Sequence, residues 1–147
     1  HEQPPAMHVY DLFDGAWSTE ESVLDRFQAN HAAIGLALPH IHKGDVFSTV
    51  PSELPDQIAF AHVDLGVGGD HDLHYRLVTH ALETVHARLS PHGVLVLMDY
   101  HVPGLTMDGN DSNPGVRKAC DAFFLNKRER VITLYGGPCS HGFVRKK

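Results

Sequence analysis

The sequence lacks the features that would place a protein outside the cytoplasm. Its 147 residues include only two cysteines, Cys120 and Cys139. Two cysteines do not make a disulfide framework, and this pair does not have the spacing of a metal site, so we predict a reducing compartment, the cytoplasm. No apolar run approaches the ~20 residues that span a bilayer, and no signal peptide is visible. We therefore expect no membrane partner.

Basic residues are also scarce. The chain has 12 Lys and Arg against 18 Asp and Glu, a formal net charge of -6. A nucleic-acid-binding surface usually needs a basic excess, so this balance argues against a nucleic-acid partner. The 13 histidines are scattered rather than grouped at ligand spacing, and we interpret most of them as solvated or at the edge of the core. The chain starts at His1 rather than Met, which leaves room for an upstream segment.

The strongest pattern in the sequence is a βαβ unit. An apolar run over 58–63 ends at Asp64, an amphipathic helix follows, and a second apolar run over 94–97 leads to Asp99. A crossover of that length predicts parallel strands. Ligands of open α/β sheets lie at the carboxyl ends of the strands. Asp64 and Asp99 are therefore predicted to face each other across a site.

Weaker patterns complete a single α/β domain over residues 1–147. The other predicted elements are strands over 7–10, 36–43, 131–134 and 142–145 and helices over 18–34, 70–89 and 114–124. Ser18 and Glu21 form a capping box, and Asn113 is an N-cap before a proline at the first helical position. We interpret Pro51 as loop punctuation. The run 58–63 is apolar on both faces, which is typical of a strand covered on both sides.

Four segments resemble class I methyltransferases that use S-adenosylmethionine (SAM), and more narrowly the macrocin O-methyltransferase family. Residues 9–15 resemble the turn after that family's second strand, and 62–65 resemble a later strand end. The more specific matches are 88–100 (RLSPHGVLVLMDY) and 113–123 (NPGVRKACDAF). The resemblance implies a Rossmann-like fold with a mostly parallel sheet and a C-terminal antiparallel hairpin.

The resemblance also implies cofactor contacts at the ends of two strands. Asp11 would accept hydrogen bonds from the ribose of SAM, with Phe13 beside it. Asp45 would reach the adenine, and Val46 would be an apolar wall.

In the family, acids after the fourth and fifth strands hold a divalent cation that binds the substrate hydroxyls. The resemblance therefore implies Mg²⁺, or another divalent cation, at Asp64 and Asp99, with Asp70 as a replacement ligand. Such a cation lowers the pKa of a bound hydroxyl. Asp64, Tyr100 and His101 are the candidates for proton transfer or substrate contact.

The chain departs from the family in two respects. Nothing in it corresponds to the family's first strand and glycine-rich loop, so we expect a fold truncated at its N-terminus. Two carboxylate positions of the family fall on Gly66 and Met98. A strand-deficient sheet exposes an edge, and we therefore expect a homo-oligomer.

Three functions remain open. The first is a SAM-dependent O-methyltransferase that acts on a hydroxyl of a sugar or another small natural product. The second is a methyltransferase-like domain without methyl transfer. The third is a metal-dependent hydrolase built on the loop 68–71.

Overall fold

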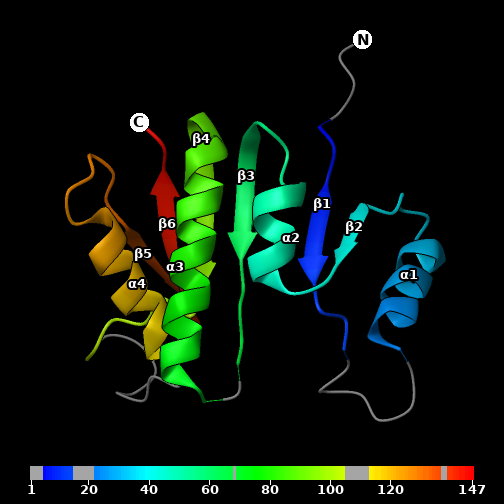
Figure 1. Cartoon of the computed structure of the whole chain (residues 1–147), viewed down its shortest axis with the longest axis horizontal. Helices are drawn as coiled ribbons and strands as arrows, with labels where there is room; N and C mark the ends of the chain where they lie inside the picture. The colour runs from blue at the N-terminus through cyan, green and yellow to red at the C-terminus, as the bar shows by residue number, and fades with distance from the viewer. Residues whose placement is uncertain (1–4, 15–21, 68, 105–112, 137–138) are drawn as a thin grey trace. The chain divides into compact units, whose positions relative to one another are not determined.

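The computed structural model describes residues 5–14, 22–67, 69–104, 113–136 and 139–147. Its elements in chain order are β1 (His8–Asp11), α1 (Val23–Ala33), β2 (His40–Lys43), α2 (Val46–Glu53), β3 (Ile58–Val63), α3 (His71–Arg88), β4 (Leu89–Met98), α4 (Pro114–Phe124), β5 (Ile132–Gly136) and β6 (Cys139–Arg145) (Figure 1). They form two compact units, which we call unit 1 (His1–Glu53) and unit 2 (Leu54–Lys147).

Unit 2 contains a four-stranded sheet in the order β3-β4-β6-β5. β3 and β4 are parallel, as the long crossover through α3 predicts. β6 pairs antiparallel with both β4 and β5, which confirms the C-terminal hairpin. The expectation of a mostly parallel sheet is wrong, because the hairpin joins the sheet through its second strand and makes the sheet mixed.

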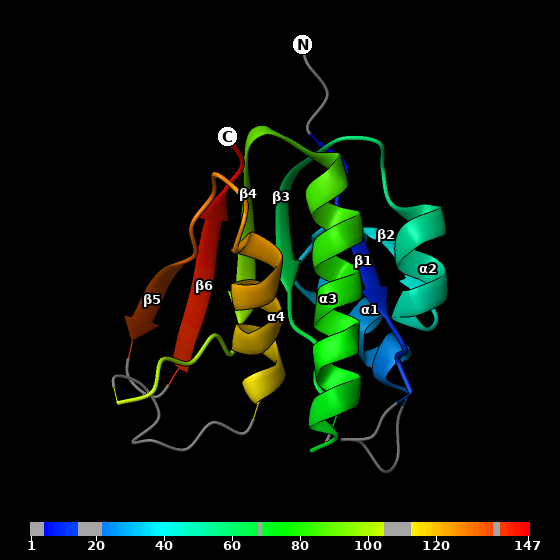
Figure 2. The same ribbon diagram turned by 60° about the vertical axis from the view of Figure 1, so that its left-hand side comes forward.

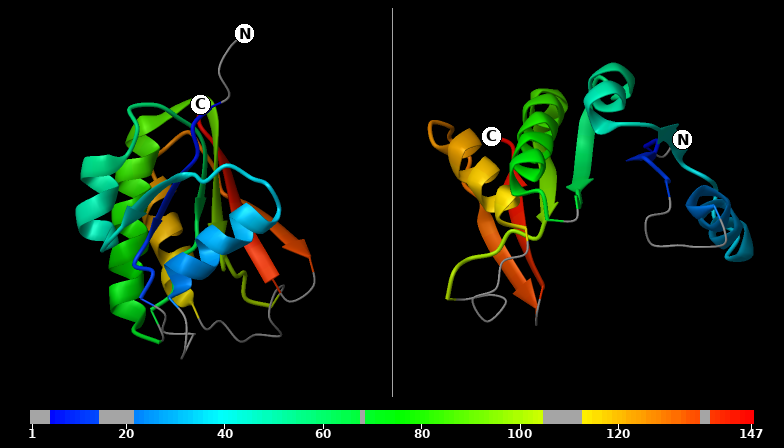
Figure 3. Two further views of the ribbon diagram at one scale, coloured as in Figure 1. Left: turned by 90° about the vertical axis from the view of Figure 1, so that its right-hand side faces the viewer. Right: turned by 60° about the horizontal axis from the view of Figure 1, so that its bottom comes forward.

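The core of unit 2 lies between this sheet and two helices. α3 and α4 lie side by side on one face of the sheet (Figures 2 and 3). The predicted apolar face of α3 is confirmed, since Leu77, Val78, Ala81, Leu82 and Val85 are buried. Leu95 and Leu97 of β4 are fully buried against it. Within the described ranges, no helix is long and apolar enough to cross a lipid bilayer.

β3 is an edge strand of its sheet. It pairs with β4 on one side, and no other described strand pairs with it. The expectation that it is covered on both faces is wrong, because Phe60 is 62% exposed and His62 is exposed. Both point to the face opposite α3, since side chains alternate along a strand. Self-association through this edge stays a prediction, which sedimentation tests.

Unit 1 contains a two-stranded parallel sheet, β1 with β2, and two helices. α1 begins at Val23, where the Ser22 hydroxyl accepts a hydrogen bond from the Asp25 amide at 3.3 Å. The predicted capping box of Ser18 and Glu21 lies outside the described residues. Gly35 follows the helix with a φ of 69°, a left-handed conformation that favours glycine and stops the helix as predicted.

α2 was not predicted, because Pro51 was interpreted as loop punctuation. The helix spans only Val46–Glu53 and contains that proline. Asp45 precedes it, and the Asp45 carbonyl accepts hydrogen bonds from the Thr49 amide at 2.9 Å and the Thr49 hydroxyl at 3.0 Å. These bonds secure the first turn, so the helix forms despite the proline.

Candidate functional site

Asp64 and Asp99 follow two neighbouring parallel strands at the same edge of the sheet. Val63 of β3 stands opposite Leu97 of β4, so each strand delivers its acid just beyond the last paired residues. Neighbouring strands are about 4.8 Å apart. The two strands are therefore parallel neighbours that end at the same edge of the sheet, as predicted. Whether the two carboxylates act in one site stays a prediction.

The carboxylate of Asp99 is held from two sides. Asn113 Nδ2 donates a hydrogen bond of 2.7 Å to Asp99 Oδ2, and His101 Nε2 lies 3.9 Å from Asp99 Oδ1. Asp99 has a φ of 56°, an uncommon conformation for a residue other than glycine. Backbone conformations of this kind cluster at functional sites. The geometry fixes the orientation of this acid at the sheet edge.

Asn113 was predicted only as the N-cap of α4. It does occupy the N-cap position before Pro114, but its side chain makes no capping hydrogen bond. The amide is directed at Asp99 instead. Sequence reasoning missed this contact, and the one available signal was the N-cap residue type, which does not reveal a partner 14 positions away.

His101 is buried, with 4% exposure. The Ser140 hydroxyl donates its proton to the Tyr100 carbonyl, so Ser140 Oγ accepts from His101 Nδ1 at 3.0 Å. This chain of contacts ties the residues after β4 to β6. The structure thus places His101 beside Asp99 in a buried position, and its role in proton transfer stays a prediction.

Tyr100 points away from the Asp99 carboxylate toward α4. Its hydroxyl donates to Asp121 Oδ1 at 3.3 Å. Burial and the Asp121 charge raise the pKa of Tyr100 to about 12. A phenol with that pKa stays protonated near neutral pH, so Tyr100 is suited to donate a hydrogen bond rather than to accept a proton.

A cavity of about 420 Å³ adjoins this tyrosine. It lies among the end of β4, α4 and the segment that leads to β5. Its lining residues are Tyr100, Cys120, Asp121, Phe124, Leu125, Arg130 and Val131. This hollow is open to solvent rather than enclosed.

Asp64 and Asp70 differ in what their carboxylates do. Asp64 is exposed at the end of β3. Asp70 is the N-cap of α3, and its Oδ1 accepts a hydrogen bond from the Leu73 amide at 2.9 Å. Asp70 therefore has a structural task at the start of a helix.

The predicted cation ligands do not form a ready-made metal centre. Asp70 caps a helix, and Asp99 Oδ2 accepts a hydrogen bond from Asn113, so two of the three carboxylates already have a partner inside the protein. Within the ranges that the structure describes, no three His, Cys, Asp or Glu residues are grouped so that they could hold a metal ion. These residues do not fit the octahedral oxygen shell that Mg²⁺ demands. Part of the loop 68–71 lies outside the described residues.

In unit 1, Asp11 ends β1 at the carboxyl edge of the parallel pair. Its Oδ1 accepts a hydrogen bond of 2.6 Å from the Phe13 amide, and its carbonyl accepts from the Gly44 amide at 3.0 Å. Phe13 has a φ of 49° and is 6% exposed, with its ring on Phe27. The Asp11 side chain itself stays exposed, as an acceptor for ribose hydroxyls must be.

Asp45 lies at the same edge, two residues after the end of β2. Its Oδ1 accepts a hydrogen bond of 2.8 Å from the Phe47 amide. Val46 begins α2 and is half-buried. Unit 1 therefore places all four predicted residues near the carboxyl edge of one parallel strand pair. The exposed carboxylates of Asp11 and Asp45 can accept hydrogen bonds from a ribose or an adenine, whereas Phe13 packs on Phe27, and the cofactor contacts stay a prediction.

Solved structures share this fold, although no family model and no curated protein matches the sequence. CalS11, a TDP-rhamnose 3'-O-methyltransferase of calicheamicin biosynthesis, is 20% identical with a TM-score of 0.66, over 95% of this chain and 58% of that chain. The O-methyltransferase NovP is 17% identical with a TM-score of 0.65, over 97% of this chain and 60% of that one. The chain has the fold of a class I methyltransferase.

A third similar structure was solved with a cofactor product. The putative methyltransferase SMU.1697c from Streptococcus mutans, in complex with SAH, is 14% identical with a TM-score of 0.65, over 97% of this chain and 76% of that one. The present chain spans less than two thirds of the length of CalS11 and NovP. At these identities, the likeness is one of fold.

Proposed function

We propose that the chain acts as a SAM-dependent O-methyltransferase on a hydroxyl of a sugar or another small natural product. The observation that carries this proposal is the placement of acids at the carboxyl edge of both parallel strand pairs, Asp11 in unit 1 and Asp64 with Asp99 in unit 2. This edge is where ligands of open α/β sheets lie. The similarity of CalS11 and NovP supports the class of acceptor.

In this proposal, the residues of unit 1 bind the cofactor and Asp64 of unit 2 takes part in proton transfer. When bound, SAM supplies an electrophilic methyl group on a sulfonium. Asp11 would accept hydrogen bonds from the ribose, and Asp45 with Val46 would contact the adenine. Asp64, an exposed acid at the end of β3, would orient the acceptor hydroxyl and accept its proton. Positioning of the two reactants supplies much of the rate.

A methyl-transfer assay on the whole chain tests this assignment. We expect label from methyl-tritiated SAM to reach a hydroxyl acceptor in a panel of nucleotide sugars and glycosides. Asp64→Asn should lower the rate by about 100-fold or more, because general base catalysis is typically worth 10²–10⁴. Asp56→Asn is the matched control, an exposed acid before the amino end of the same strand. Equal rates in both variants would refute the role of Asp64.

A methyltransferase-like domain without methyl transfer is the second candidate. It is favoured by the Asp99 carboxylate, which is already engaged by Asn113 inside the protein. The same assay separates the candidates when it is run with and without Mg²⁺. Absence of transfer under both conditions, with a folded chain, would favour this second candidate, whereas transfer that needs no Mg²⁺ would agree with the lack of a ready-made metal centre among the described residues.

A further inference from the structure

Charge is distributed unevenly along the chain. Residues 114–147 contain eight Lys and Arg against two Asp and Glu, a formal charge of +6, whereas residues 1–113 contain four against sixteen, a formal charge of -12. The net charge of the whole chain, on which the expectation of no nucleic-acid partner rests, does not reveal this separation. Salt screens charges that lie more than about 10 Å apart, so a local basic surface attracts anions even on an acidic molecule.

Six of the eight basic residues gather at one end of unit 2. They belong to the segment between α4 and β5 and to residues 145–147, and Figure 2 shows these two segments at the same end of the sheet. The Lys147 amide donates a hydrogen bond of 3.2 Å to Glu129 Oε1, which joins the two segments directly. We call the six residues the basic patch: Lys127, Arg128, Arg130, Arg145, Lys146 and Lys147.

The basic patch has little counter-charge. Glu129 is the single acid of its two segments, and this residue is only 7% exposed, with His86 Nε2 3.6 Å from its Oε1. Among the described residues, no side chain of the basic patch forms an ion pair with a carboxylate. Arg130 Nη1 donates instead to the main-chain carbonyl of Lys127 at 2.7 Å. Like charges repel one another, so such a surface is suited to an anionic partner.

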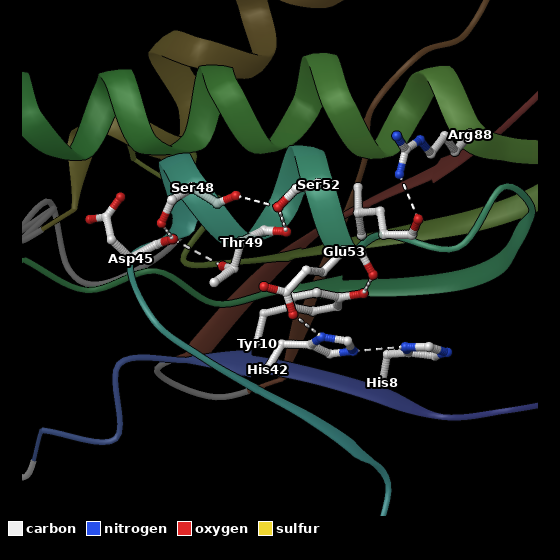
Figure 4. A network of polar contacts seen from close by, with 10 residues as sticks. His8, Tyr10, His42, Asp45, Ser48, Thr49, Ser52, Glu53 and Arg88 are labelled. Carbon is white, nitrogen blue, oxygen red and sulfur yellow. Dashed lines mark hydrogen bonds and ion pairs between the residues drawn. The ribbon is translucent and has the colours of Figure 1, made fainter.

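A structural task does not account for the whole patch. Arg128 follows the end of α4, where a positive charge is favourable, but Arg145 ends a strand, and strands have little net dipole. Arg88, directly before β4, shows what a structural arginine does here, because its Nη1 donates to the Leu54 carbonyl at 2.6 Å (Figure 4). Within the described ranges, the exposed side chains of Arg128, Arg145 and Lys147 make no hydrogen bond.

A hollow adjoins the basic patch at Arg130. It is the solvent-open cavity beside Tyr100, and Arg130 is one of its lining residues. Leu125, which is 73% exposed, and Val131 give the hollow apolar walls. Asp121 adds carboxylate oxygens to the same lining. Apolar walls suit the flat ring of an unstacked nucleobase, and a carboxylate accepts hydrogen bonds from exocyclic amino groups of bases.

We propose that the basic patch binds single-stranded nucleic acid, with phosphates on the patch and one base in the adjoining hollow. Three of the six residues are arginines, whose planar guanidinium groups match the geometry of a phosphate. A positively charged surface beside a place for bases is the usual arrangement for binding single strands. An anionic membrane fits less well, because a flat surface also approaches the acidic remainder of the chain, whereas a single strand is narrow.

The basic patch is separate from the proposed site of methyl transfer. Arg145 stands opposite Val94 in the β4–β6 pair, and Asp99 follows five residues later along the chain. At the rise of a strand, this separation is about 16 Å. Binding of nucleic acid therefore requires no methyl transfer, and we expect it in the absence of SAM.

Fluorescence anisotropy of a labelled RNA of about 12 nucleotides and mixed sequence, titrated with the whole chain, tests the proposal. We expect saturable binding at about 50 mM salt, with a logarithm of the affinity that falls linearly with the logarithm of the salt concentration, by about 0.7 per phosphate contact. Absence of binding at this salt concentration, or an affinity that salt does not change, would overturn the proposal. Binding to phosphatidylserine vesicles without binding to RNA would overturn it in favour of a membrane surface.

Charge reversals locate the binding surface. Arg128→Glu and Lys147→Glu, both at exposed positions, should each weaken RNA binding about tenfold or more and reduce the salt slope by about 0.7. Arg76→Glu is the matched control, because it makes the same change in net charge at an exposed position of α3 outside the patch, and it should bind RNA like the unmodified chain. Leu125→Ala should weaken binding without changing the salt slope, since it removes only apolar contact. Equal weakening in the Arg76 and Arg128 variants would contradict the assignment to the basic patch.

Discussion

Each of the two units is stabilised internally by a different kind of contact. In unit 2, aliphatic side chains from α3, β4 and β6 are fully buried, among them Leu82, Leu97 and Val144. In unit 1, α1 has no buried residue, and imidazole and phenol rings line one face of the sheet. Burial of aliphatic surface varies little with pH, whereas contacts between ionisable rings depend on it. Unit 1 should therefore be the part of the molecule that acid loosens first.

The largest expected effect comes from the aliphatic core of unit 2. Leu97→Ala removes a fully buried side chain of β4 and should lower the free energy of unfolding by about 2–5 kcal/mol. Leu134→Ala is the matched control, because Leu134 on the edge strand β5 is 47% exposed. This substitution should lower the free energy of unfolding by well under half as much as Leu97→Ala. Urea unfolding followed by circular dichroism measures both. Similar decreases in the free energy of unfolding for the two variants would mean that the burial of the side chain does not determine its contribution to stability.

A smaller effect is expected at Gly115, where α4 packs tightly against α3. A Cβ atom at Gly115 would lie 2.8 Å from both His74 Nδ1 and the Tyr75 amide nitrogen. Gly115→Ala should therefore cost about 1–3 kcal/mol through overpacking. Gly66→Ala, with no heavy atom within 4 Å of its Cβ, should be close to neutral. The melting temperatures of the two variants provide the comparison, and equal values would argue against a tight contact between the helices.

The smallest effect is the acid response of unit 2 itself. Burial and the Lys146 ammonium lower the pKa of His86, against the opposing charge of Glu129. A lowered folded pKa means that the unfolded chain binds the proton more tightly, so this stability is complete above about pH 6.5 and is lost as the pH falls through the folded value.

His86→Gln should remove this part of the pH dependence of the free energy of unfolding between pH 7.5 and 5.5. Urea midpoints followed by the amide signals of β4 report unit 2 alone. His71→Gln, an exposed histidine in the first turn of α3, should behave like the unmodified chain. If His86→Gln retained the full acid response, the assignment to His86 would be wrong.

The sequence predicted the elements whose patterns are strong and local. β3, α3 and α4 have long apolar runs or a helical period, and their bounds agree with the structure within a few residues. α2 was missed because it is short and contains Pro51. β4 begins at Leu89, directly after α3, whereas the apolar run that predicts this strand begins only at residue 94.

Contacts between distant positions could not be predicted in the same way. The parallel pairing that brings the ends of β3 and β4, with Asp64 and Asp99, to one edge of the sheet follows from a crossover rule, so it was accessible from the sequence. The bond from Asn113 to Asp99 and the bond from His8 to His42, 34 positions apart, depend on side-chain directions that no local pattern encodes.

Calorimetric titration of the whole chain with SAM, with and without Mg²⁺, tests most directly whether strand-end acids make this protein a methyltransferase. We predict micromolar binding that Asp11→Asn weakens by roughly tenfold or more, since hydrogen bonds to a charged group are worth about 1.5–3 kcal/mol. Asp14→Asn, at an exposed acid three residues on, should bind SAM like the unmodified chain. No heat of binding under either condition, or equal affinity in the Asp11 and Asp14 variants, would contradict the assignment.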